Sequence, residues 1–180
     1  MIYQLHTHYY DFLKYRKAFD FIKLNKPKLV VEYGTGESTY YLYQCLQELN
    51  YGGRLIAYED SEEWYNEFSN VFPEYKEVVK LVDIVMEDKT LGYVSYNHNI
   101  EEIEDVGLVV LDGPDYRVHL TDTNYPSNVT TNIEKIIKHI NKPVHYFIDG
   151  RRGCVNYYNK LLDKKYVNQI VKELQTILGE

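Results

Sequence analysis

Stretches of helical spacing alternate with short apolar runs along the whole chain. Between residues 9 and 24, apolar side chains recur every three or four positions, which predicts a helix there. The same spacing predicts further helices over residues 37–49, 60–72, 129–140 and 155–178, the last interrupted near 163–166. Glycine or proline follows the second and third of these segments, as is usual where helices end.

The apolar runs between these helices have the composition of strands that are buried on both faces. They cover residues 28–33, 54–59, 77–85, 106–112 and 142–149, and residues 91–97 alternate like an extra strand or a hairpin arm. Regular alternation of strand and helix predicts an α/β sandwich around a largely parallel sheet. Since no repeat or linker interrupts the pattern, we expect one domain over residues 1–180, with a helical extension at 1–27.

Composition and charge narrow the class of protein. A net charge of −7 argues against a protein that wraps nucleic acid, which would carry a basic surface. Cys45 and Cys154 match no zinc or redox spacing, and two thiols do not make a disulfide framework. The N-terminus lacks a signal-sequence layout, and no apolar run approaches the ~18 residues of a membrane span. We therefore expect a cytoplasmic protein without membrane or nucleic-acid partners.

The chain is rich in residues with AT-rich codons, including 20 tyrosines. This bias indicates a virus or an AT-rich microbe as the source, and for a virus the compartment would be the host cytoplasm. Tyrosines that simply fill amphipathic positions would account for the same count.

Acidic residues stand at the ends of four expected strands: Glu32, the pair Glu59 and Asp60, Asp112, and Asp149. Burying an unpaired carboxylate is costly, so these side chains are expected at the edge of the sheet. In an open parallel sheet, ligands bind beyond the carboxyl ends of the strands, near the point where the strand order reverses. The acids therefore predict one common crevice.

The loop after the first strand contains the glycine pair Gly34 and Gly36. Glycine allows a sharp turn and lets the backbone approach a ligand, although an ordinary tight turn would explain the pair equally well. Ser38 and Thr39 then open the next helix with hydroxyl and N–H groups. The pattern is G-x-G without the third glycine of a dinucleotide fingerprint, which favours a smaller nucleotide-type cofactor.

The second strand ends in Glu59 and Asp60. A carboxylate at this position can accept hydrogen bonds from both hydroxyls of a ribose. Glu59 is the better placed for that role, because Asp60 is expected to cap the following helix.

Four segments in this order resemble the class I S-adenosylmethionine-dependent methyltransferases: "VVEYGTGEST", "LIAYEDSEEWY", "VGLVVLDGPDYR" and "YFIDGRRG". The resemblance covers roughly residues 28–155, a cofactor-binding core. It implies a Rossmann-like three-layer fold with about seven strands in the central sheet, and S-adenosylmethionine as cofactor. At matching positions it implies Glu32, Gly34 and Gly36 near the methionine part, Glu59 at the ribose and Asp83 near the adenine. Ser38, which stands where many members have a third glycine, and Asp60 are further candidate cofactor-binding residues.

The same resemblance places Asp112 beside the reactive group of the cofactor, where a general base would lie. Methyl transfer to a hydroxyl requires positioning of the acceptor and removal of its proton. Arg117 and Asp115 follow in the next loop and are expected to orient the substrate, and His119 is a second candidate base. Asp112 would alternatively stabilise the turn at "GPDY".

Arg151 and Arg152 follow the fifth expected strand. Guanidinium groups bind carboxylates or phosphates through paired hydrogen bonds, so these residues suit an acidic acceptor such as a uronic sugar. A surface ion pair is the alternative. In catechol-type O-methyltransferases, acids at the positions of Asp112 and Asp149 hold magnesium, but Gly150 stands where those enzymes have an amide, so Mg²⁺ is possible but not favoured.

The sequence thus predicts an O-methyltransferase acting on a small molecule or a carbohydrate. Two alternatives stay open: an enzyme that binds NAD(P) or a nucleotide sugar on a related fold, and a non-catalytic protein that kept the fold. The sequence does not indicate an oligomeric state.

Overall fold

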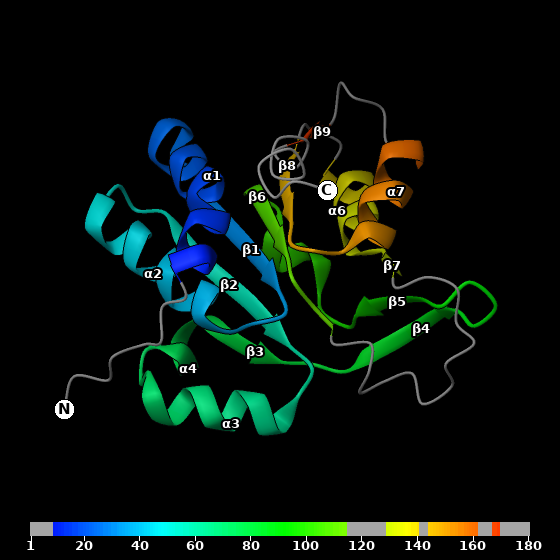
Figure 1. The fold of residues 1–180 in the computed structure, drawn as a ribbon, viewed down its shortest axis with the longest axis horizontal. Coiled ribbons are helices and arrows are strands. Elements are labelled where there is room, and N and C mark those ends of the chain that lie inside the picture. Colours follow the sequence, from blue (N-terminus) through cyan, green and yellow to red (C-terminus); the bar gives the residue numbers. More distant parts are fainter. Residues whose placement is uncertain (1–8, 115–128, 141–143, 162–166, 170–180) are drawn as a thin grey trace.

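The structure is a computed structural model that describes residues 9–114, 129–140, 144–161 and 167–169, and Figure 1 shows a central parallel sheet. Six strands lie in the order β3-β2-β1-β6-β8-β9, and each neighbouring pair is parallel. Their bounds are β1 Leu29–Tyr33, β2 Arg54–Glu59, β3 Val79–Leu81, β6 Val106–Leu111, β8 Val144–Ile148 and β9 Val167–Gln169. Within this sheet the chain order is 3-2-1-4-5-6, the doubly wound order of Rossmann-like folds. The predicted α/β, Rossmann-like class is confirmed.

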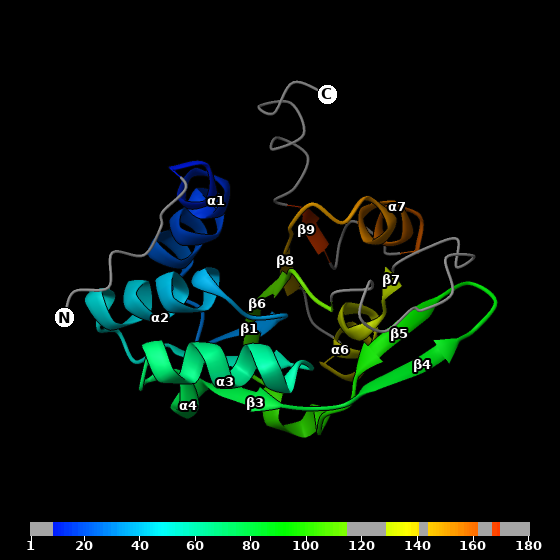
Figure 2. The same ribbon diagram turned by 60° about the horizontal axis from the view of Figure 1, so that its bottom comes forward.

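Helices cover both faces of the sheet, as Figure 2 shows. Helices α1 (Tyr9–Asn25) and α2 (Glu37–Leu49) pack on one face through a cluster that includes Ile22, Leu42 and Leu108. On the other face, α6 (Asn132–Ile140), α7 (Arg152–Leu161) and the short helix η1 (Ile100–Ile103) bury a second cluster. Helices α3 (Glu62–Val71) and α4 (Tyr75–Val78) cover the edge near β3. Within the segment expected as an N-terminal extension, α1 thus packs into the core of the domain.

The seven-stranded central sheet is not what the structure shows: three further strands form a separate small sheet. The strand expected over residues 77–85 is divided into the end of α4, β3 and β4 (Ile84–Asp88). β4 pairs antiparallel with β5 (Tyr93–Tyr96), the expected hairpin arm, and β5 pairs with β7 (Val129–Thr130). Half-buried and exposed residues alternate along β4, as expected for a strand with one solvent-facing side. The residue pattern of 77–85 does not show where the chain leaves one sheet for the other.

The C-terminal part also departs from the expectation of one long, interrupted helix. Helix α7 begins at Arg152 and ends at Leu161, and residues 167–169 pair with β8 as the edge strand β9. Similarly, residues 129–130 belong to β7 before α6 begins at Asn132. Both strands are shorter than four residues, too short for a periodic pattern to distinguish from a helix.

Two glycines bring the ends of β1 and β6 into direct contact. Gly34 has φ of 79°, and a Cβ on it would lie 2.3 Å from the Cα of Gly113. The amides of Asp112 and Gly113 donate to the Tyr33 carbonyl over 2.8 and 2.7 Å, and the Gly34 amide donates to the Tyr58 carbonyl over 2.9 Å. Gly34 therefore fits against another strand end, which is a different reason for glycine than the ligand approach expected from sequence.

Replacing Gly34 with alanine should destabilise the fold more than the same change at Gly52. Both residues have positive φ, but a Cβ on Gly52 would meet nothing within 4 Å. Gly52→Ala should lower the free energy of unfolding by roughly 1–2 kcal/mol, the cost of the left-handed backbone. Gly34→Ala should cost about 1–3 kcal/mol more because of crowding. Denaturant unfolding of both variants measures this difference, and equal losses would show that the Gly34–Gly113 contact yields easily.

Candidate functional site

A cavity of about 660 Å³ opens where the strand order reverses, between the carboxyl ends of β1 and β6. It extends over the ends of β2 and β8 and along the start of α3. Five of the residues singled out from the sequence line it together: Gly34, Glu59, Asp60, Asp112 and Arg151. The strand ends thus meet at one crevice, but of the predicted acids only Glu59, Asp60 and Asp112 line it, while Glu32 and Asp149 do not.

The carboxylate of Glu59 is engaged by the two loops beside it. One oxygen accepts hydrogen bonds from the Thr35 amide and hydroxyl, over 3.0 and 2.6 Å. The other accepts from the amides of Asp60 and Ser61, over 2.9 and 2.8 Å. Burial raises the pKa of Glu59, and the hydrogen bonds from Thr35 and Ser61 partly offset this. A carboxylate has about four acceptor positions, so Glu59 serves chiefly to join the β1–α2 and β2–α3 loops.

Asp60 lines the cavity and does not cap the following helix. The N-cap of α3 is Ser61, whose hydroxyl accepts from the Trp64 amide over 3.2 Å. Asp60 is half-buried one residue earlier. The expected cap at Asp60 is therefore wrong, and the amides of Asp60 and Ser61 instead donate to Glu59.

Trp64 forms part of the rim of the cavity. Its Nε1 donates to the Thr35 carbonyl over 2.7 Å, and the ring lies beside Phe68 with centroids 4.8 Å apart. The side chain remains 41% exposed, which leaves an aromatic face at the opening. Gly36 lies behind this ring, because a Cβ there would be 3.9 Å from Nε1.

Glu32 and Ser38 lie below the cavity and do not line it. The Ser38 hydroxyl donates to one oxygen of Glu32 over 2.6 Å, and the second oxygen has no hydrogen-bond partner among the described residues. Glu32 is fully buried, and burial raises its pKa to about 8 despite the hydrogen bond from Ser38. Burial therefore favours the protonated form of Glu32, which belongs to the support of the β1–α2 loop.

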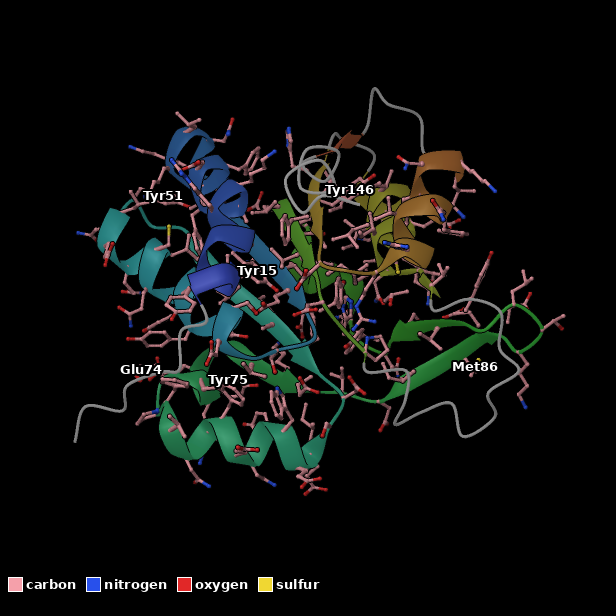
Figure 3. All side chains as sticks on the ribbon, in the orientation of Figure 1. Tyr15, Tyr51, Glu74, Tyr75, Met86 and Tyr146 are labelled. Atoms are coloured by element: carbon pink, nitrogen blue, oxygen red, sulfur yellow. The ribbon has the colours of Figure 1, made fainter. Side chains whose placement is uncertain are left out.

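Tyr15, labelled in Figure 3, connects two of the predicted acids from the N-terminal helix α1. Its hydroxyl lies 3.0 Å from an oxygen of Asp112 and 3.3 Å from an oxygen of Asp149. Burial and then these two carboxylates raise the pKa of Tyr15 well above its usual value, so the phenol stays protonated. Helical spacing indicated that Tyr15 is buried, but no sequence signal showed that α1 lies over these strand ends.

The Asp112 and Asp149 side chains do not fit a magnesium site. The Tyr15 hydroxyl occupies the space between their oxygens that a shared ion would need. Mg²⁺ requires near-octahedral oxygen coordination and keeps several waters, whereas Asp149 is only 6% exposed. Within the described part of the chain, no group of three or more His, Cys, Asp or Glu side chains could hold a metal ion.

The remaining candidates divide between the cavity, the surface and segments outside the description. Arg151 is half-buried, and its guanidinium donates to the carbonyl of Asp112, while Arg152 is exposed and does not line the cavity. Asp83 is exposed in the turn between β3 and β4 and likewise lies outside the lining. Arg117, Asp115 and His119 lie outside the described residues.

The lining of the cavity is strongly acidic. Among the residues that the structure describes, five carboxylates and one guanidinium line it, and the acids are Glu59, Asp60, Glu63, Glu67 and Asp112. A cleft lined by one sign of charge raises the local concentration of ligands of the opposite sign. The geometry therefore suits a ligand with cationic groups and opposes one with a diphosphate.

Comparison of the chain with known protein families, curated proteins and solved structures finds no match. Across the described residues, no helix combines the length and the apolar character needed to cross a membrane.

The raised pKa of Glu32 predicts a specific dependence of stability on pH. The folded chain retains a proton that the unfolded chain releases above pH 4.5, until the pH reaches about 8. Across this window Glu32 should lower the free energy of unfolding by at most about 1.4 kcal/mol per pH unit. Glu32→Gln removes this titration, so its stability relative to wild type should rise from pH 4.5 to 8 and then level off. Urea unfolding across this range measures it, with exposed Glu48→Gln as control, and parallel curves for Glu32→Gln and wild type would contradict it.

Proposed function

We propose that the protein is an S-adenosylmethionine-dependent methyltransferase that acts on a hydroxyl of a small molecule or a carbohydrate. The observation that carries the proposal is the acidic cavity at the switch point of a doubly wound sheet, beside the Gly34 turn. That is where open α/β sheets bind their ligands. The four segments that resemble class I methyltransferases contribute to the same cavity.

The charge of the cavity favours this donor over the alternatives. S-adenosylmethionine carries a sulfonium and an ammonium group, both of which are attracted by the carboxylates of the lining. NAD(P) and nucleotide sugars carry a diphosphate, which would face Asp60 and Asp112, and among the described residues of the lining only Arg151 is a cation. The residues of the lining therefore suit a nucleoside that carries positive charge.

We assign the donor contacts to residues that face the cavity. Asp60 is the acceptor for the ribose hydroxyls, because Glu59 is occupied by the loops. The exposed face of Trp64 provides a flat partner for the adenine ring. Glu32 acts indirectly by holding Ser38 at the start of α2.

Asp112 is the proposed general base. When bound, S-adenosylmethionine supplies an electrophilic methyl group whose transfer leaves the electron pair of the broken C–S bond on sulfur. Asp112 lines the cavity, so its carboxylate can accept the proton that the acceptor hydroxyl loses as its oxygen bonds to the methyl carbon. The hydroxyl of Tyr15, which does not line the cavity, positions this carboxylate through a hydrogen bond. The carboxylates of the same lining disfavour an acidic acceptor such as a uronic sugar.

Thermal unfolding with added ligands tests the proposal. S-adenosylhomocysteine and S-adenosylmethionine should each raise Tm, since a ligand that binds only the folded state stabilises it. NAD and UDP-glucose should not. A shift with NAD or UDP-glucose alone would support the related nucleotide-binding enzymes, and no shift with any ligand would support a non-catalytic protein.

The role of Asp60 can be separated from that of Glu59 by two amide variants. Asp60→Asn should weaken S-adenosylhomocysteine binding by about tenfold or more, because hydrogen bonds to a charged group contribute most. Glu59→Gln should lower Tm itself, because an amide presents N–H groups to backbone donors. Calorimetric titration and thermal unfolding give both quantities, with exposed Glu48→Gln outside the lining as control. Unchanged affinity in Asp60→Asn would refute the ribose assignment.

A further inference from the structure

A second cavity, of about 490 Å³, lies between the β4–β5 hairpin and helix α6. Its lining contains two lysines, two histidines and two asparagines, and no aspartate or glutamate among the described residues. This is the opposite of the acidic cavity at the switch point. The two cavities share one residue, Tyr96, which is 2% exposed.

The basic side of this cavity is one face of α6. Asn132, Lys135 and His139 follow at intervals of three and four residues, which places them on the same side of a helix, and Lys138 adjoins them. The buried residues Ile133 and Ile136 face the core from the other side. The pattern of α6 therefore directs its cations to the cavity and its apolar residues to the sheet.

Each lysine is held in place and keeps capacity for a ligand. Lys135 donates to Glu87 and, over 2.9 Å, to the Ser95 hydroxyl, and Lys138 donates to Glu134. An ammonium group has three donors, so within the described residues Lys135 retains one and Lys138 two. Neither acid lines the cavity. The acids therefore anchor the lysines from outside the lining, and each also offsets part of the charge of its lysine.

The opposite wall is neutral and rigid. The His98 ring stacks on Tyr58 with centroids 4.1 Å apart. Its Nδ1 donates to the Asn99 carbonyl over 3.2 Å, so its Nε2 accepts from the Tyr33 hydroxyl over 2.8 Å. Burial lowers the pKa of His98, which keeps the ring uncharged. Asn132 bonds both the amide and the carbonyl of Tyr96, over 2.8 and 3.1 Å, and so fixes α6 against β5.

We propose that this cavity is a second ligand site, which binds a small phosphate-bearing compound with its phosphate against Lys135 and Lys138. Phosphate oxygens accept from the free N–H groups of the two ammonium ions. The rest of the compound lies over the neutral wall, where exposed Asn97 offers an amide group. The site does not depend on the proposed methyl transfer, since none of its charged residues lines the acidic cavity.

Titration of the full chain with glucose 6-phosphate, observed by amide NMR, tests the site. Saturable shifts are expected in residues 95–98 and 132–139, glucose should cause none, and inorganic phosphate should bind more weakly than the sugar phosphate. Lys135→Met and Lys138→Met should each weaken binding by about tenfold, the effect of one charge-assisted contact. Lys160→Met, which removes an exposed lysine of α7 outside this lining, should change the affinity less than about twofold.

A second pair of variants tests for a gain of affinity for glucose 6-phosphate. Glu87→Gln releases Lys135 from its acidic partner and should strengthen glucose 6-phosphate binding by about threefold or more, whereas exposed Glu77→Gln on α4 should not. The proposal is overturned if no saturable binding occurs. It is also overturned if the lysine variants and Lys160→Met lose affinity equally, if inorganic phosphate binds as tightly as the sugar phosphate, or if Glu87→Gln weakens binding.

Discussion

The contact between the backbones of Gly34 and Gly113 is the constraint on which the site depends. It joins the ends of β1 and β6, the two strands between which the sheet reverses its order. A Cβ on Gly113 would lie 1.9 Å from the Tyr96 hydroxyl as well as against Gly34, so a side chain at either glycine would separate the strand ends. Both glycines also line the cavity, so main-chain atoms form part of its wall.

The acidic residues at the strand ends around that contact have different environments. Glu32 lies in the core with a raised pKa, Glu59 accepts from two loops, and Asp112 and Asp60 face the cavity. Desolvation explains the division, since a buried carboxyl group must take up a proton or be surrounded by donors. Tyr15 supplies such a donor to Asp112 from the far side of the sheet edge. The Asp112 carboxylate, which lines the cavity, is thus positioned by Tyr15, which does not line it.

The sequence predicted the elements with long periodic patterns and the meeting of their strand ends, because parallel strands bring their carboxyl ends to one edge. It did not predict the division of the apolar run at residues 77–85, since composition is the same on both sides of the break. The sequence also did not show that loop amides surround the Glu59 carboxylate, because the number of amides around a side chain depends on backbone geometry. The contact of Tyr15 depends on which helix packs over which strand, which local spacing does not encode.

The two cavities show why net charge describes a binding surface poorly. The chain carries −7 overall, yet its negative and positive linings lie on either side of Tyr96. Interactions between exposed charges weaken beyond about 8–10 Å at physiological salt, so each cavity responds to its own lining more than to the total. A ligand with cationic groups and one with a phosphate can therefore be accommodated by one small domain, separated by a tyrosine whose backbone is fixed by Asn132.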